Sequence, residues 1–396
     1  MQKERIFLLL RQIWDSCSDV AVRLLILKVL ANLSTLDSTR EHFVRFGWLT
    51  DLVRCLNSPQ LEFNLLGAKI LANLDLDQPS LPDGVYLMHP QRLTREQPEV
   101  DLIFVHGLNG GIFKTWRQKD VPGRRRLKRA RENPFIRSAR AQAYYTQCWP
   151  RDWLPGDFPR LRILGIDYAS FLTHWGTKCP ELPHRTTLEY RSREFQQKLE
   201  ACGVGERPII WIAHSMGGLI VKHMLCRQSQ LASSPSSSDP SKSDSFTSSG
   251  SSRALLDKTI GIVFYSTPHF GSPVASNYVE RRGYRYLLMP SAEVHELIEG
   301  SPYLRGLNSE FVEVVKANQI QCLSVAETEL TDFGMGLILL PVPEYSANPG
   351  VGSFVKIRSS HLYVCKPESK QCASYRLLVQ FLRKLLEPCE TCSPIK

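Results

Sequence analysis

The residue with the clearest chemical potential is a serine at the junction of two apolar runs. Ser215 follows the run at residues 208–213 and precedes the run at residues 219–225, with the letters AHSMGG around it. A strand, a tight turn and a helix in this order hold a serine hydroxyl at the carboxyl edge of a sheet, as in the nucleophile elbow G-x-S-x-G. Ala213 stands where that pattern has its first glycine. The sequence therefore predicts a catalytic serine, and the alternative is an ordinary strand-to-helix turn.

A serine hydroxyl becomes a good nucleophile only when an imidazole takes its proton, and a carboxylate must orient that imidazole. In folds with this elbow, the order along the chain is serine, acid, histidine. The histidines that follow Ser215 are His223, His269, His295 and His361. His361 comes shortly after a predicted strand near the end of the chain and has acids before it, so it is the preferred base. His269 is the second candidate, with a packing role in a turn as its alternative.

Three acidic residues compete to complete the triad. Glu327, Glu329 and Asp332 all follow the predicted strand at residues 320–326. Glu327 stands immediately beyond the end of that strand, so it is the first choice, and the other two remain open. Glu344 is closer to the next predicted strand, and a surface role is expected for it.

A second strand with a glycine-rich turn after it lies earlier in the chain. The run VDLIFV is followed by HGLNGG at residues 106–111. In a hydrolase with a serine elbow, the loop after such a strand donates a backbone N–H to the developing oxyanion, and the residue after the serine donates another. Leu108 and Met216 are the predicted oxyanion pair. His106 and His214 flank the glycine turns and are expected to orient loops rather than transfer protons.

The elements that must position these residues alternate between strand and helix. Strands are predicted at residues 161–168, 209–213, 259–266, 320–326 and 353–358, and a helix at residues 188–202. This alternation predicts the α/β class with a mainly parallel, doubly wound sheet, whose ligand site lies at the carboxyl ends of the strands. We place this domain at residues 99–390. A helical insertion is expected at residues 278–318 and a disordered serine-rich loop at residues 229–252.

Residues 1–78 show helical periodicity with an internal echo. The heptapeptide KVLANLS at residues 28–34 returns as KILANLD at residues 69–75, an offset of 41. This is an armadillo-type period, and unrelated amphipathic helices are the alternative. Because about two repeats are too few to stand alone, we expect them to dock on the next domain or to continue upstream, and a protein partner could use them. A proline-rich linker is predicted at residues 79–98.

The composition is that of a globular protein, with 43% hydrophobic residues and a net charge of +10. The charge is concentrated in a predicted insertion at residues 117–140. From Trp116 to Arg140, ten basic residues oppose two acidic ones, so this segment carries +8. It could bind anionic membrane head groups, act as a nuclear localisation signal or form a solvated loop. No nucleic-acid partner is expected.

Cysteine usage and hydropathy argue against a disulfide-rich protein, a zinc-binding protein and a membrane-spanning helix. The eleven cysteines are scattered along the chain, so reduced thiols are expected rather than a disulfide framework. Cys389 and Cys392 have half of a zinc-ligand spacing without a second pair, so neither a metal nor a cofactor is expected. No run reaches the roughly 18 apolar residues that a membrane-spanning helix needs.

Five motifs together resemble a known family. They are VHGLNG at residues 105–110, CWPRDWLP at residues 148–155, AHSMGG at residues 213–218, STPHFGS at residues 266–272 and HLYVCKP at residues 361–367. With armadillo-like helices in front of them, this combination resembles the serine active site-containing protein family over nearly the whole chain.

The resemblance implies a lipase-like α/β-hydrolase fold and a serine hydrolase or acyltransferase that acts on glycerophospholipid esters. It implies phosphatidylglycerol as the substrate class, and phospholipid remodelling at contacts between mitochondria and endoplasmic reticulum. Full-length members carry an upstream membrane segment, so a cytosolic or peripheral location is also considered for this form. The rival hypothesis is a catalytically weak scaffold, in which the armadillo-like helices recruit a partner.

Overall fold

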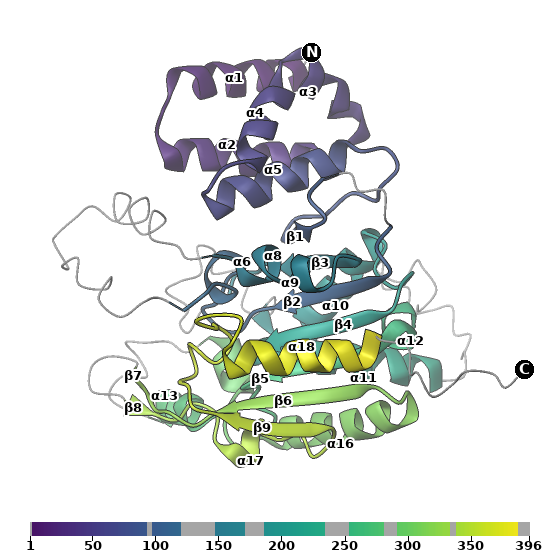
Figure 1. Ribbon diagram of the computed structural model, residues 1–396, viewed down its shortest axis with the longest axis vertical. Coiled ribbons are helices and arrows are strands. Elements are labelled where there is room, and N and C mark those ends of the chain that lie inside the picture. The colour runs from purple at the N-terminus through teal and green to yellow at the C-terminus, as the bar shows by residue number, and fades with distance from the viewer. Residues whose placement is uncertain are drawn as a thin grey trace, which may run out of the picture. The chain divides into compact units, whose positions relative to one another are not determined.

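The fold is seen in a computed structural model of the chain (Figure 1). The structure describes residues 2–92, 97–119, 147–170, 186–233, 253–280, 291–332 and 338–386. Most of the basic insertion, the serine-rich stretch after Ser233 and the pair Cys389 and Cys392 lie outside these residues. The chain divides into two compact units. The first comprises residues 1–104, 111–168 and 194–204, and the second comprises residues 105–110, 169–193 and 205–396.

The first unit begins with a group of helices. These are α1 (Gln2–Ser16), α2 (Val20–Leu33), the short 3-10 helix η1 (Asp37–Thr39), α3 (Arg40–Arg45), α4 (Trp48–Leu56) and α5 (Leu61–Leu74). The two copies of the sequence echo fall in α2 and α5, which pack against each other. Asn73 of α5 donates to the Ser34 hydroxyl at the end of α2 at 2.9 Å, so a polar contact also joins the two copies of the echo. The armadillo-type repeat itself stays a prediction.

The first unit also holds three strands and several short helices. The strands are β1 (Val85–His89), β2 (Val100–Val105) and β3 (Leu161–Ile166), and the helices are α6 (Ile112–Thr115), α8 (Trp149–Asp152) and α9 (Leu154–Asp157). β1 pairs with β3 in antiparallel fashion. Residues 79–98 were expected to be a linker, and β1 corrects this for part of them. Val85 and Met88 bury their side chains in the sheet, a signal that the surrounding prolines obscured.

The second unit holds the remaining strands of the main sheet. These are β4 (Ile209–His214), β5 (Thr259–Tyr265), β6 (Gln321–Glu327) and β9 (Ser353–Ile357), and each is parallel to the next. The strand order of the seven-stranded sheet is β1-β3-β2-β4-β5-β6-β9. β4 to β6 are almost wholly buried, as their continuous apolar runs predict. A small second sheet pairs β7 (Thr331–Asp332) with β8 (Ile338–Leu339).

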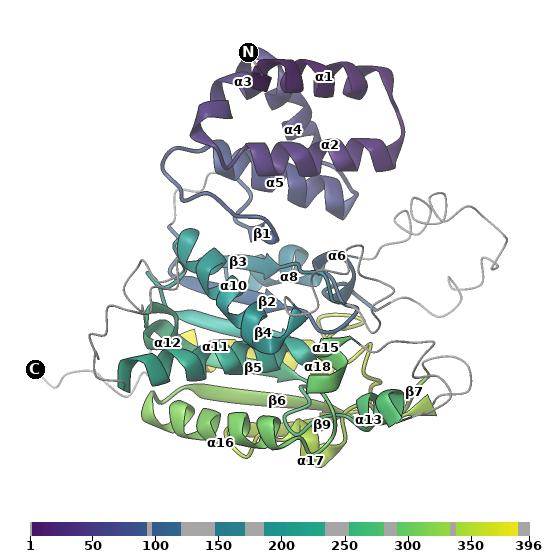
Figure 2. The ribbon, with the colours of Figure 1, turned by 180° about the vertical axis from the view of Figure 1, so that it is seen from behind.

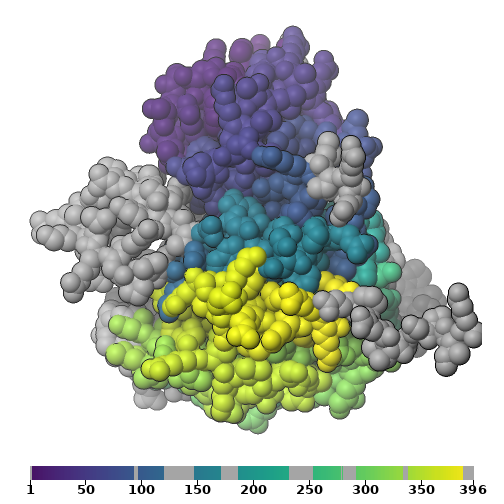
Figure 3. Space-filling view, viewed as in Figure 1, coloured from purple at the N-terminus to yellow at the C-terminus, as the bar shows by residue number. Residues whose placement is uncertain are grey.

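Helices cover both faces of the sheet in the second unit. α11 (Met216–Ser233) and α16 (Pro302–Ala317) lie beside each other on one face, and α18 (Ala373–Leu386) lies on the other (Figures 1 and 2). In the space-filling view, the segment that includes α18 covers much of its face of this unit (Figure 3). The shorter helices are α12 (Ala254–Lys258), α13 (Pro273–Glu280), α15 (Ala292–Glu296) and α17 (Glu344–Ala347). α10 (Leu188–Ala201) contributes residues to both units.

This topology is the α/β-hydrolase fold, and it confirms the predicted fold class. The mainly parallel sheet carries a serine turn at the end of β4, between strand and helix. One boundary differs from the sequence-based prediction: α11 continues to Ser233, so residues 229–233 are helical rather than part of the serine-rich loop. Among the described helices, none combines the length and the apolar character that crossing a bilayer requires.

Candidate active site

Ser215 occupies a strained turn between β4 and α11. Its φ is +55°, a left-handed conformation that a residue with a side chain adopts at a cost of about 1–3 kcal/mol. Its backbone N–H donates to the carbonyl oxygen of Tyr265 at 2.9 Å, which ties the turn to the end of β5. The hydroxyl therefore projects from the carboxyl edge of the sheet, as the elbow pattern predicts.

Two glycines after the serine are required by close contacts. A Cβ atom at Gly217 would lie 2.5 Å from the carbonyl oxygen of His106, and a Cβ at Gly218 would lie 2.1 Å from the Thr267 hydroxyl. Real Cβ atoms do not come this near to other atoms, so larger residues would push α11 out of place. Ala213, the departure from the usual first glycine, lies fully buried in β4. The turn thus accepts a methyl group before the serine and none after it.

The structure brings the three predicted triad residues into one hydrogen-bonded chain. His361 Nε2 lies 3.0 Å from Ser215 Oγ, and His361 Nδ1 lies 3.0 Å from Glu327 Oε1. Because a carboxylate only accepts, the imidazole carries its proton on Nδ1, which leaves Nε2 free to accept from the serine. All three side chains are buried. This is the arrangement in which an imidazole can take a serine proton.

Two contacts fix the loop that carries His361. Its backbone N–H donates to the Thr331 hydroxyl at 3.1 Å, and its carbonyl oxygen accepts from His214 Nε2 at 3.0 Å. Burial lowers the pKa of His214 well below its usual value, and the neighbouring imidazole of His361 lowers it further. His214 is therefore neutral and has its proton on Nε2. It orients the His361 loop, which is the kind of role the sequence indicated for it.

Glu327 is held at the end of β6 from two sides. Its backbone N–H donates to the Ser266 hydroxyl at 3.2 Å, and its Oε1 atom accepts a second hydrogen bond from Val342 N–H at 3.1 Å. Ser266 itself has a φ of +46°, so the residue that follows β5 is strained in the same way as the elbow serine. Sequence reasoning missed Ser266, Thr331 and Val342. Only the serine in the STPHFGS motif carried any signal.

The other candidates for acid and base lie elsewhere. Glu329 pairs with Arg358 at 3.1 Å and Glu344 pairs with Lys356 at 2.9 Å, while Asp332 is exposed on β7. Among the histidines, His223 lies 2.8 Å from the Ser192 hydroxyl, and His295 is exposed. His269 is buried against Lys222, with His269 Nδ1 and Lys222 Nζ 3.0 Å apart. The geometry thus favours His361 and Glu327 over every alternative left open by the sequence.

The predicted oxyanion loop lies against the serine. A Cβ atom at Gly107 would lie 2.6 Å from Ser215 Cβ and 3.2 Å from Ser215 Oγ, so only glycine fits there. Leu108 follows this contact, and Met216 opens α11 directly after the serine. Within the described parts of the chain, neither backbone N–H donates to another residue. Both donors are therefore available near the serine oxygen, as an oxyanion site requires.

No metal centre accompanies this arrangement in the part of the chain that the structure describes, where no three His, Cys, Asp or Glu side chains gather in a way that could hold an ion. The described cysteines are all free, and most are buried. Burial raises the pKa of the Cys226 and Cys322 thiols to about 12, so both stay protonated.

Comparison with known proteins yields close sequence relatives, although no family model matches the chain. Protein SERAC1 of Danio rerio is 40% identical over 365 residues, which cover 91% of this chain and 51% of that protein. The chain is thus similar in sequence to SERAC1 over most of its own length. Protein SERAC1 of Homo sapiens is 38% identical over 363 residues, with the same coverage of both chains. The chain spans about half the length of the curated relatives it matches.

Solved structures with a similar fold are much more distant in sequence than SERAC1. The mature lipase BlEst2 of Bacillus licheniformis is 12% identical with a TM-score of 0.42, covering 74% of this chain and 97% of the lipase. An α/β-hydrolase enzyme from a lagoon sediment metagenome, MGS-MChE2, is 9% identical with a TM-score of 0.40, covering 76% of this chain and 95% of its own.

Proposed function

We propose that the chain is a lipase-type serine hydrolase or acyltransferase, with Ser215 as nucleophile, His361 as general base and Glu327 as its orienting acid. The observation that carries the proposal is the hydrogen-bonded chain from Ser215 Oγ through both nitrogens of His361 to Glu327, with 3.0 Å at each step. The glycine contact at Gly107 supports it, because it brings an N–H-bearing loop against the nucleophile.

The proposed reaction follows from the proton positions. Ser215 Oγ attacks the ester carbonyl carbon while its proton passes to His361 Nε2. The N–H groups of Leu108 and Met216 stabilise the negative charge on the former carbonyl oxygen. When the tetrahedral intermediate collapses, His361 returns the proton to the leaving alcohol, and the acyl group stays on the serine. Water or a lipid hydroxyl then attacks the acyl-enzyme by the same steps in reverse roles.

The substrate class proposed is a glycerophospholipid ester, with phosphatidylglycerol first among them. The support is the family resemblance of the motifs around the site and the homology to SERAC1. Contacts between mitochondria and endoplasmic reticulum are the proposed place of action. Incubation with vesicles of phosphatidylglycerol or phosphatidylcholine, followed by mass spectrometry, separates the possible outcomes. Free fatty acid indicates water as the acceptor, and a newly acylated lipid indicates transfer.

Ser215→Ala tests the nucleophile directly. We expect loss of covalent labelling by a fluorophosphonate and a fall in ester turnover by several orders of magnitude, because the triad acts as a unit. The melting temperature should change little, since one hydroxyl at a turn contributes little to the core. Ser324→Ala is the matched control, because this serine is also buried and lies on β6 away from the triad contacts. Full labelling of Ser215→Ala would disprove the assignment.

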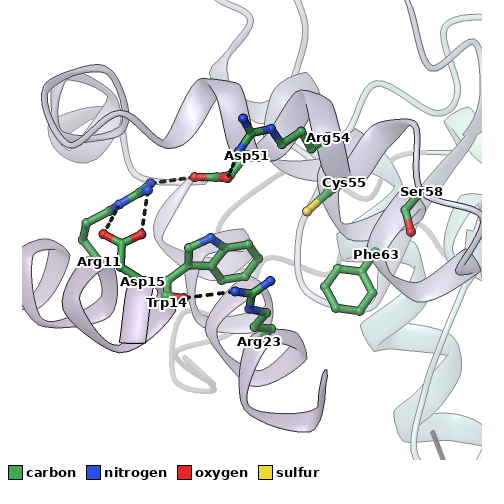
Figure 4. Close-up of a pocket in the computed structure, with 9 residues that line it drawn as sticks. All are labelled: Arg11, Trp14, Asp15, Arg23, Asp51, Arg54, Cys55, Ser58 and Phe63. Atoms are coloured by element: carbon green, nitrogen blue, oxygen red, sulfur yellow. Dashed lines mark hydrogen bonds and ion pairs between the residues drawn. The ribbon is translucent and has the colours of Figure 1, made fainter. Parts of the chain in front are cut away.

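A pocket among the N-terminal helices favours a second candidate function, partner binding. Its volume is about 370 Å³ (Figure 4). The lining residues are Arg11, Trp14, Asp15, Arg23, Asp51, Arg54, Cys55, Ser58 and Phe63. Asp51 accepts from Arg11 at 2.6 Å and from Arg54 at 3.2 Å, and the Arg23 guanidinium lies 4.9 Å from the centre of the Trp14 ring.

The lining includes three arginines and a tryptophan, which are residue types enriched among the hot spots of protein interfaces. We propose that a protein partner inserts a side chain here. If wild-type Ser215 does not react with a fluorophosphonate, this binding role becomes the primary function and the hydrolase fold a scaffold. If it reacts, the pocket adds recruitment to an active enzyme.

A further inference from the structure

A lysine is buried in the core of the second unit. Lys222 lies on α11, two turns after Ser215, and its side chain is fully buried. Its Nζ atom lies 2.6 Å from Asn308 Oδ1 and 3.0 Å from His269 Nδ1, and 4.9 Å from the centre of the Phe311 ring. Among the described residues, no acid lies within ion-pair distance of this amine.

This burial is costly. It lowers the pKa of Lys222 to about 7, and the nearby thiols of Cys226 and Cys322 offset this only in part. The neighbouring His269 is neutral, because burial holds its pKa well below the usual value and Lys222 lowers it further. A leucine or methionine would fill the same space without desolvating an amine. The amine is therefore best explained by the two polar groups that it joins.

Each of those groups is linked, through one further contact, to a segment that carries a triad residue. His269 lies in the loop that starts with Ser266, and the Ser266 hydroxyl accepts the backbone N–H of Glu327. Asn308, on α16, donates from its Nδ2 atom to the carbonyl oxygen of Pro349 at 3.0 Å. Pro349 lies just before β9, the strand that leads to His361.

We propose that Lys222 is a positioning residue, which joins the helix behind the nucleophile to the segments that hold Glu327 and His361. His269 and Asn308 are its partners, so His269 acts in support of the triad. α11 and α16 lie side by side (Figure 2). The amine therefore bridges two packed helices and the loop after β5. The inference rests on the proposed serine chemistry, since it assigns Lys222 a role in that site.

The decisive variant is Lys222→Met, which keeps an unbranched side chain one heavy atom shorter and removes the amine. We expect fluorophosphonate labelling of Ser215 to slow by about tenfold or more, because small displacements of reacting groups cost up to about 100-fold in rate. Lys69→Met is the matched control. Lys69 is also fully buried, but it lies on α5 in the first unit, where its Nζ atom donates to Pro82 O and lies 5.1 Å from the centre of the Tyr86 ring.

A double-mutant cycle separates positioning from a general loss of packing. His269→Asn removes the imidazole while leaving the lysine, and it also serves if Lys222→Met does not fold. If the two residues act through one contact, the double variant should label no more slowly than the slower single variant. Purely additive effects would indicate two unrelated packing defects and would overturn the proposal.

A pH series gives a readout that does not need activity. The pKa of Lys222 is about 7 in the folded chain and near 10.5 when unfolded, so between these values the unfolded chain binds more protons. Folding stability should therefore rise with pH across this window, and Lys222→Met should lose that part of the rise. His269, Cys226 and Cys322 face the same amine and remain in both proteins.

The outcomes distinguish this inference from the proposed function. No labelling of wild-type Ser215 would contradict the proposed function itself. Normal labelling in wild type and an unchanged rate in Lys222→Met would overturn the positioning role alone. An equal slowing in Lys69→Met would overturn it as well, because the effect would then follow any buried lysine. An identical pH slope in Lys222→Met and wild type would show that the amine does not make these buried contacts.

Discussion

At the scale of single residues, the strain at the end of two neighbouring strands is informative. Ser215 and Ser266 both adopt positive φ values, although neither is a glycine. The first presents a hydroxyl to His361, and the second presents a hydroxyl to the backbone of Glu327. Unfavourable conformations of this kind persist where the surrounding structure over-determines them, and they concentrate at functional sites. The two strained serines thus support the proposed roles of Ser215 as nucleophile and Glu327 as its acid.

The residue-scale prediction concerns Glu327 and His361. Glu327→Gln should slow acylation of Ser215 strongly, because an amide cannot stabilise the imidazolium that forms. His361→Ala should slow it at least as much. The increase in activation free energy in the double variant should be far smaller than the sum of the increases in the two single variants, since both residues act on one proton transfer. Rates of fluorophosphonate labelling measure all three.

Glu329→Gln is the control for the acid, since Glu329 pairs with Arg358 on the surface. It should label at the wild-type rate. If this variant lost more activity than Glu327→Gln, the choice of acid would be wrong.

At the scale of elements, glycines decide how closely the elbow helix approaches the oxyanion loop. Gly217 on α11 comes so near to His106 that its missing side chain is a requirement. Gly306 on α16 has no atom within 4 Å of an added Cβ, so the same substitution there meets open space. The two positions form a natural pair, because both lie in helices of the second unit and differ in their surroundings.

Gly217→Ala should destabilise the protein by more than about 1 kcal/mol and lower the rate of labelling, because backbone atoms block the new methyl group. Gly306→Ala should stabilise it by roughly 0.5–1 kcal/mol through helix propensity alone. Thermal unfolding measures both. A stabilising effect of Gly217→Ala would mean that α11 can shift without cost, contrary to the contacts described.

Elements and site differ in how far the sequence could predict them. Apolar runs predicted β4, β5 and β6, because buried parallel strands carry that signal directly. They also placed Ser215 at the end of β4. β9 was also predicted, although this edge strand has no buried residue. β1 escaped notice because it is short and follows prolines. The contacts of Thr331 and Val342 with the triad could not be foreseen, since they join segments that only the folded chain brings together.

At the scale of the whole molecule, charge is distributed very unevenly. Of the net +10, the segment from Trp116 to Arg140 supplies +8, so the rest of the chain is close to neutral. Most of this segment lies outside the residues that the structure describes. Its interaction with anionic membranes therefore remains a prediction from the sequence, and it is open to a direct test.

Replacement of the basic residues between 124 and 131 by glutamine should weaken co-sedimentation with vesicles rich in phosphatidylglycerol. Each basic residue near an anionic surface contributes about 1 kcal/mol, and the effect fades within a Debye length, so wild-type binding should also weaken as salt rises. Turnover of a small soluble ester should not change, because Ser215, Gly107 and their contacts are untouched. Equal sedimentation of both proteins at low and physiological salt would contradict membrane binding and favour the interpretation of the segment as a solvated loop.

The end of α11 has a practical consequence. The helix starts beside Ser215 and contains 18 residues, so its far end at Ser233 lies about 27 Å along the axis from that serine. The serine-rich stretch begins there. After it, α12 leads into β5 at the amino edge of the sheet, which is opposite to the carboxyl edge that carries Ser215. The described residues on both sides of this stretch thus lie away from Ser215, so we expect an affinity tag or a fluorescent reporter inserted between them to leave the chemistry undisturbed. It would allow the enzyme to be purified or followed in cells with both chain termini left free.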